Sequence, residues 1–146
     1  MDYRVFVDSD VILDVLAKRE KFYENSSIIL ELMKDRIIKG HTSPVIIANI
    51  NYILTKYGNS KIAKESIKKI LKYISVLSIT EEIIIDAINS KMKDFEDAIQ
   101  FYTALDNKID ILITRNVDDY TEKKNIEIMK PDEFVKIFNE LNKNRT

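Results

Sequence analysis

Short apolar runs alternate with longer segments of helical periodicity along the chain. The runs predict strands at residues 4–8, 41–42, 75–79, 111–114 and 126–129. The periodic segments predict helices at residues 11–18, 22–38, 44–58, 59–73, 81–90 and 95–106, with a closing helix from residue 131. Strands that alternate with helices are typical of a parallel sheet covered on both faces. We therefore predict an α/β fold, a three-layer sandwich around a central parallel sheet.

Several helix ends are marked by residues with known capping preferences. Ser43 followed by Pro44 is a cap and a first helical position, and Asp94 can cap the helix that follows it. Gly40 is predicted to end the helix before it, because glycine is the usual residue just past a helix end. His41 is predicted to be a loop residue with no chemical role.

Composition indicates one cytoplasmic domain spanning residues 1–146. Cysteine is absent, which excludes disulfides and thiolate chemistry and is typical of a reducing cytosol. No apolar stretch reaches the roughly 18 residues that a membrane span needs, and the start of the chain lacks the order of a signal peptide. Lys+Arg 23 against Asp+Glu 24 gives a net charge of -1, so binding of nucleic acid would rest on local patches.

Two scarce residue types exclude further classes of site. Gly40 and Gly58 are the only glycines, so the glycine-rich turns that bind dinucleotides or phosphates cannot be built. A single histidine cannot serve a zinc cluster of several histidines. The chemistry must come mainly from carboxylates.

Acidic residues follow or open three of the predicted elements. Asp8 and Asp10 come at the end of the first strand, residues 94–97 (DFED) open a helix, and residues 114–120 (TRNVDDY) follow the fourth strand. Because ligands of parallel sheets bind beyond the carboxyl ends of the strands, these acids are expected to converge. Carboxylates in one crevice suit Mg²⁺ or Mn²⁺, and a metal-bound water can attack a phosphodiester.

Each acid also has a structural interpretation. Asp94 and Asp97 can form a capping box, Asp10 can cap a helix, and Asp119 can form a turn. Asp97 heads a helical row that is predicted to face inward, which capping alone does not explain. Asp8 ends a strand and has no helix register to account for it, so it is the best candidate for a functional residue.

Four segments, in the same order, resemble the PIN-domain nucleases, the family of the VapC-type toxins. FVDSDVILDVL resembles the opening block of that family, DFEDAIQFYTAL its acidic helix, ILITRNVDDY its third block and KPDEFVKIF its ending. The resemblance implies a PIN-like, Rossmann-like fold and a Mg²⁺- or Mn²⁺-dependent endoribonuclease. It also implies a toxin that is neutralised by an antitoxin protein and that forms a homodimer.

The resemblance also implies roles for particular residues. Asp8 and Asp97 become metal ligands and catalytic residues, Asn116 and Asp10 further metal ligands, and Asp119 a nearby catalytic acid. The family usually has a glutamate on the helix after the second strand, where this chain has Asn49. An amide brings no charge, so we expect weaker metal binding, and we hypothesise that Asp10 partly compensates.

Substrate binding is assigned to five residues: Asn49, Ser43, Arg115, Lys61 and Lys68. The two lysines belong to a basic stripe on the helix predicted at residues 59–73, which could follow an RNA backbone or could be an ordinary solvated face.

Two other functions remain open at the level of sequence. The DSDV segment fits the opening of haloacid-dehalogenase-type phosphatases. That fold also requires a later Gly-Asp pair, whereas no glycine follows Gly58 in this chain. A PIN-like RNA-binding module with weakened catalysis would explain Asn49.

Overall fold

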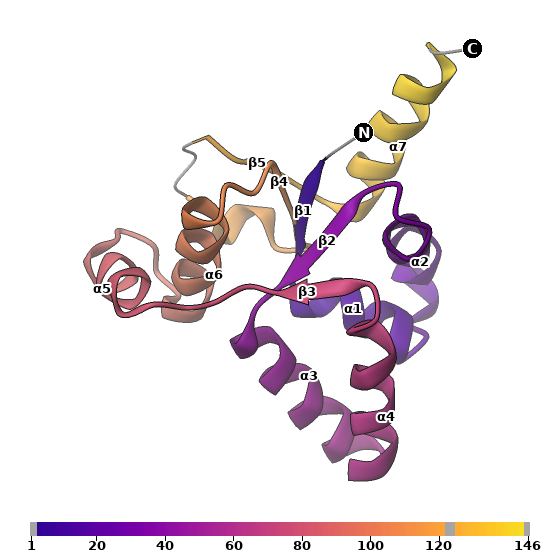
Figure 1. Cartoon of the computed structure of the whole chain (residues 1–146), viewed down its shortest axis with the longest axis horizontal. Helices are drawn as coiled ribbons and strands as arrows, with labels where there is room; N and C mark the ends of the chain where they lie inside the picture. Colours follow the sequence, from indigo (N-terminus) through magenta and orange to yellow (C-terminus); the bar gives the residue numbers. More distant parts are fainter. Residues whose placement is uncertain (1–2, 122–124, 145–146) are drawn as a thin grey trace.

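The computed structural model describes residues 3–121 and 125–144. Within these residues five parallel strands form one sheet in the order β3-β2-β1-β4-β5 (Figure 1). The strands are β1 (Arg4–Val7), β2 (Lys39–Thr42), β3 (Ile74–Val76), β4 (Ile111–Ile113) and β5 (Glu127–Met129). The amino-terminal strand β1 therefore lies at the centre of the sheet. This confirms the predicted parallel sheet.

Helices cover both faces of the sheet. They are α1 (Ser9–Leu16), α2 (Glu20–Lys34), α3 (Pro44–Tyr57), α4 (Ser60–Ile70), α5 (Glu81–Asn89), α6 (Phe95–Asp106) and α7 (Pro131–Lys143). Figure 1 shows α5 and α6 on one side of the sheet and α1, α2 and α7 on the other, which gives the predicted three layers. In the described part of the chain, no helix has the length and apolar character to cross a membrane.

The core lies on both sides of the central strand. Val5, Phe6 and Val7 are fully buried, and they are covered by Ile12 from α1 and Phe101 from α6, both also fully buried. Burial of such side chains is the main contribution to folding. Because β1 is fixed on both edges and both faces, the residues that follow it start from a rigid position.

The start of β2 differs from the prediction. The helix expected at residues 22–38 ends at Lys34, and Gly40 lies inside the strand rather than at a helix end. Arg36 turns the chain with a left-handed φ of 59°. A Cβ atom on residue 40 would lie 2.5 Å from the Sδ atom of Met33, so glycine lets α2 pack closely on β2.

His41 lies in β2, which confirms the strand predicted at residues 41–42, and it is buried there, so its assignment as a loop residue is wrong. Burial, assisted by Arg4 and Lys39, lowers the pKa of His41 to about 4. The imidazole is therefore uncharged at neutral pH.

Candidate active site

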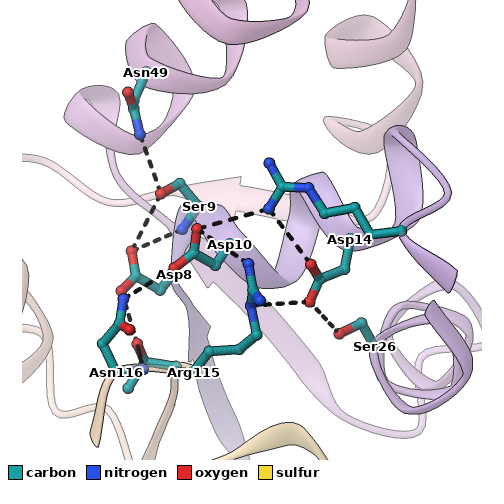
Figure 2. A network of polar contacts seen from close by, with 10 residues as sticks. Asp8, Ser9, Asp10, Asp14, Ser26, Asn49, Arg115 and Asn116 are labelled. Atoms are coloured by element: carbon teal, nitrogen blue, oxygen red, sulfur yellow. Dashed lines mark hydrogen bonds and ion pairs between the residues drawn. The ribbon is translucent and has the colours of Figure 1, made fainter. Parts of the chain in front are cut away.

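Asp8 stands at the carboxyl end of the central strand and at the start of α1. Its backbone N–H donates to the carbonyl of Ile113 at 3.0 Å, which continues the pairing between β1 and β4 past the last strand residue. Its Oδ1 atom accepts from the N–H of Ser9 at 2.7 Å, so Asp8 is the N-cap of α1 (Figure 2). Strand end and helix start together fix this carboxylate at the edge of the sheet.

The Oδ2 atom of Asp8 accepts hydrogen bonds from two residues that follow β4 in the chain. Thr114, directly after β4, donates from Oγ1 to Oδ2 at 2.9 Å, and the buried Tyr120 donates from its hydroxyl at 3.4 Å. Burial raises the pKa of Asp8, and the hydrogen bonds from Ser9 and Thr114 oppose this shift. The sequence analysis missed both Thr114 and Tyr120. Only the position of Thr114 at a strand end could have suggested its role.

Asp97 lies in the first turn of α6 and belongs to the same group of acids as Asp8. Burial raises its pKa to about 7, followed in effect by the charges of Asp94, Asp8, Asp119 and Glu96. Asp94 accepts from the N–H of Asp97 at 2.8 Å, which confirms that it caps α6. The structure therefore brings Asp8 and Asp119 close enough to Asp97 for their charges to raise the pKa of Asp97. Glu96, not singled out from sequence, lies close enough for the charge of Asp8 to raise its pKa.

Asp10 is committed to other partners. Its Oδ2 atom accepts from the side-chain amide of Asn116 at 3.0 Å, and its Oδ1 atom lies 3.6 Å from Nη2 of Arg115 and 3.9 Å from Nη1 of Arg19 (Figure 2). Both oxygens of Asp10 face cationic or amide donors, and its expected role as a metal ligand stays a prediction. Its charge is also balanced locally, which weakens the idea that it compensates for Asn49.

Arg115 is part of the same network. Its Nε atom lies 3.4 Å from Oδ2 of Asp14, a fully buried carboxylate that also accepts from Ser26 at 3.1 Å. Its guanidinium carbon lies 4.0 Å from the centroid of the Phe22 ring. Asp14 was missed from sequence, although its spacing of four from Asp10 places both on one face of α1. Arg115 thus balances the buried negative charge of Asp14, and this ion pair limits the role of its guanidinium in substrate binding.

Asn49 lies one hydroxyl group away from Asp8. Its Nδ2 atom donates to Oγ of Ser9 at 3.2 Å, and that hydroxyl donates to Oδ1 of Asp8 at 3.5 Å. Ser43 does not fit its expected role in substrate binding. It is fully buried, caps α3 and donates to the Gln100 side chain at 2.7 Å.

Lys61 and Lys68 are exposed on α4. Within the described residues neither forms an ion pair with the acids of the site. A cleft of about 400 Å³ adjoins the site instead, lined by Lys21, Phe22, Asn25, Arg115, Asn116 and Lys130, among others.

The acids suit a hard cation that keeps much of its water. Among the described residues, no group of three or more acidic or histidine side chains is placed so that it could hold a metal ion by itself. Mg²⁺ is commonly bound through one or two carboxylates, with waters and phosphate oxygens completing the shell. Asp8 and Asp97 could supply these carboxylates, and a cation would offset both the burial and the neighbouring negative charges that raise the pKa of Asp97.

A family model described as PIN domain matches residues 4–118, from β1 into the segment that contains Asn116. The chain belongs to the PIN domain family. The match confirms the family inferred from the sequence segments, and it does not support the phosphatase interpretation of DSDV.

The chain is similar to known proteins over most of its length. The chain is 24% identical to Ribonuclease VapC1 of Aquifex aeolicus (strain VF5), covering 94% of this chain and 97% of that protein. Among solved structures, a toxin-antitoxin complex from Klebsiella pneumoniae has a TM-score of 0.65 at 18% identity, covering 87% of this chain and 97% of that one. Mycobacterium tuberculosis VapC20, described as a sarcin-ricin loop cleaving toxin, has a TM-score of 0.58 at 14% identity, covering 74% and 86%. The two structures support the fold.

Proposed function

We propose that this PIN domain is a divalent-metal-dependent endoribonuclease and the toxin of a toxin-antitoxin pair. The observation that carries the proposal is the position of Asp8 at the carboxyl edge of the sheet, with Asp97 near enough for the charge of Asp8 to add to the burial that raises the pKa of Asp97 to about 7. Carboxylates with perturbed pKa values are frequent at catalytic sites. The names of the relatives, a ribonuclease and a cleaving toxin, support the choice of RNA as substrate.

In the proposed mechanism Asp8 and Asp97 would hold Mg²⁺ or Mn²⁺, which, when bound, would supply a water of lowered pKa and offset charge on the phosphate. Thr114 and Tyr120 keep Asp8 in one orientation, so little reorganisation is needed when substrate binds. Asp119 stays a candidate for proton transfer, because it lies near Asp97 on an exposed turn. Asn116 is a candidate ligand through its amide oxygen, since its amide nitrogen is bound to Asp10.

The RNA strand is proposed to lie in the cleft beside Asn116. Lys21 and Lys130 offer charge to the phosphates, and Phe22 offers an apolar surface. An antitoxin partner and a homodimer are proposed from the family resemblance, and the toxin-antitoxin complexes among the structural neighbours support the partner.

The decisive experiment is RNA cleavage with and without metal. The purified protein is incubated with mixed RNAs in the presence of Mn²⁺, in EDTA, and in EDTA followed by excess Mn²⁺. We expect internal cleavage with Mn²⁺, none in EDTA and recovery on metal addition. Cleavage that persists in EDTA would contradict metal dependence, and intact RNA in every condition would favour a binding module without catalysis.

Replacing Asn49 by glutamate is expected to tighten Mn²⁺ binding about tenfold, roughly 1.4 kcal/mol, because it adds a carboxylate one hydroxyl from Asp8. Isothermal titration with Mn²⁺ at neutral pH measures the effect. Asn49→Gln is the matched control, since it lengthens the side chain in the same way without charge. Equal affinities in the two variants would show that residue 49 does not face the ion.

A further inference from the structure

A second cleft, of about 600 Å³, lies where the helices α1, α2 and α4 end. Arg36, which precedes β2, and Tyr73, which precedes β3, both line it. It is therefore at the starts of these strands, whereas Asp8 and Thr114 follow the ends of β1 and β4 (Figure 1). We call it the helix-end cleft. It shares no lining residue with the cleft of about 400 Å³ beside Arg115 and Asn116, which we call the active-site cleft.

The polar lining of the helix-end cleft consists of cations and hydroxyl groups. The cations are Lys18, Lys34, Arg36, Lys69 and Lys72, and the hydroxyl groups are those of Ser66 and Tyr73. No carboxylate lines it, and within the described residues none of these cations is ion-paired with an acid. Glu31 is the acid whose charge reaches this region, since it contributes to a raised pKa of Tyr73. The expected ligand is an anion that only accepts hydrogen bonds.

Part of the positive charge in the helix-end cleft compensates the partial negative charges at the carboxyl ends of the three helices. α1 ends at Leu16, α2 at Lys34 and α4 at Ile70, and each helix end carries roughly half a negative charge. Three half-charges do not cancel five full ones, so positive charge remains in excess. Two of the cations also occupy the position just past a helix end with left-handed φ values, 49° at Lys18 and 59° at Arg36. Glycine is the usual residue there, and helix stability alone would favour it.

We propose that the helix-end cleft binds the phosphodiester backbone of RNA, outside the segment that is cut. The identity of the polyanion as RNA rests on the proposed function, whereas the preference for an anion rests on the lining. One negative charge per nucleotide, repeated along a strand, matches five cations at and just past the ends of three helices better than a single anion does. A folded RNA held here and in the active-site cleft would contact two separate regions of the protein.

The test compares two triple variants of the full chain that carry the same change in net charge. Arg36→Glu, Lys69→Glu and Lys72→Glu reverse the cleft, and Lys91→Glu, Lys108→Glu and Lys136→Glu reverse exposed lysines elsewhere. Fluorescence anisotropy with a labelled single-stranded RNA, in EDTA and over a series of salt concentrations, gives the dissociation constant. We expect the cleft variant to bind at least ~10-fold more weakly at low salt, with a salt slope smaller by about 2. The control variant is expected to stay within ~3-fold of the unchanged chain.

Two outcomes would overturn the inference. One is equal binding of RNA by the two variants, whether or not both are weakened. The other is a polyglutamate peptide of the same charge that binds the unchanged chain more tightly than RNA does. Thermal unfolding of both variants checks that each is folded. Failure of the proposed function is distinguishable, because it would be seen as absent Mn²⁺-dependent cleavage by the unchanged chain. RNA binding through the cleft can hold in that case.

Discussion

Replacing Asp8 by asparagine is expected to lower Mn²⁺-dependent RNA cleavage by at least ~1,000-fold, equivalent to about 4 kcal/mol of transition-state stabilisation. The substitution removes the charge that would hold the ion but keeps the shape of the side chain. Its remaining oxygen can accept from the N–H of Ser9, and the Thr114 hydroxyl can turn to accept from the new amide. The protein should therefore fold, and initial rates of cleavage of one labelled RNA measure the effect.

The matched control for this substitution is Asp118→Asn. Asp118 is exposed in the turn after β4, beside Asp119 in sequence. We expect it to cleave within ~3-fold of the unchanged chain, as is usual for substitutions at exposed positions. A rate for Asp8→Asn above a tenth of the unchanged rate would remove Asp8 from the proposed metal site.

Replacing Asp97 by asparagine is expected to stabilise the metal-free protein while it lowers cleavage. Its pKa rises from 3.8 to about 7 on folding, mainly through burial and then through neighbouring acids. An acid with a raised pKa favours the folded state fully below its unfolded value, and this contribution is lost as the pH rises through the folded value. The free-energy cost of keeping Asp97 ionised in the folded protein is therefore absent near pH ~4 and complete near pH ~8. Asparagine removes it.

The expected gain in the free energy of unfolding is about 1–3 kcal/mol at pH ~8, less than the full shift implies because water partly screens the site. Urea unfolding in EDTA at several pH values measures it. Asp86→Asn, an exposed change on α5, is the control and should show no such trend. A gain for Asp97→Asn that is the same at pH ~4 and pH ~8 would mean that ionisation at this position is not coupled to folding.

The central elements could be predicted because their signals are local. The run Val5–Val7 is apolar and pairs on both edges, and the helix at Phe95–Asp106 begins after a capping Asp94, so pattern and structure coincide. The second strand could not be bounded in this way. Lys39 and Gly40 have no apolar pattern, and they become a strand because β1 offers its free edge. Tertiary pairing decided that element.

The candidate site likewise contains residues that could be predicted from local sequence signals and residues that could not. Asp8 and Asp97 were predicted from their positions at a strand end and a helix start. Asp10 is only two residues from Asp8, but α1 turns it toward Arg19 and Arg115, and sequence does not reveal the positions of those cations. Thr114 and Tyr120 were missed because uncharged residues carry no sequence signal for contact with a carboxylate 106 and 112 positions away.

The central position of β1 also bears on how the protein is made. One flanking strand of Asp8, β4, and two of its hydrogen-bond donors, Thr114 and Tyr120, are synthesised more than a hundred residues after Asp8 itself. A nascent or prematurely terminated chain that ends before them lacks the groups that orient the carboxylate. The proposed ribonuclease would thus remain inactive beside the translating ribosome and its messenger until the segment from β4 to Tyr120 has been made.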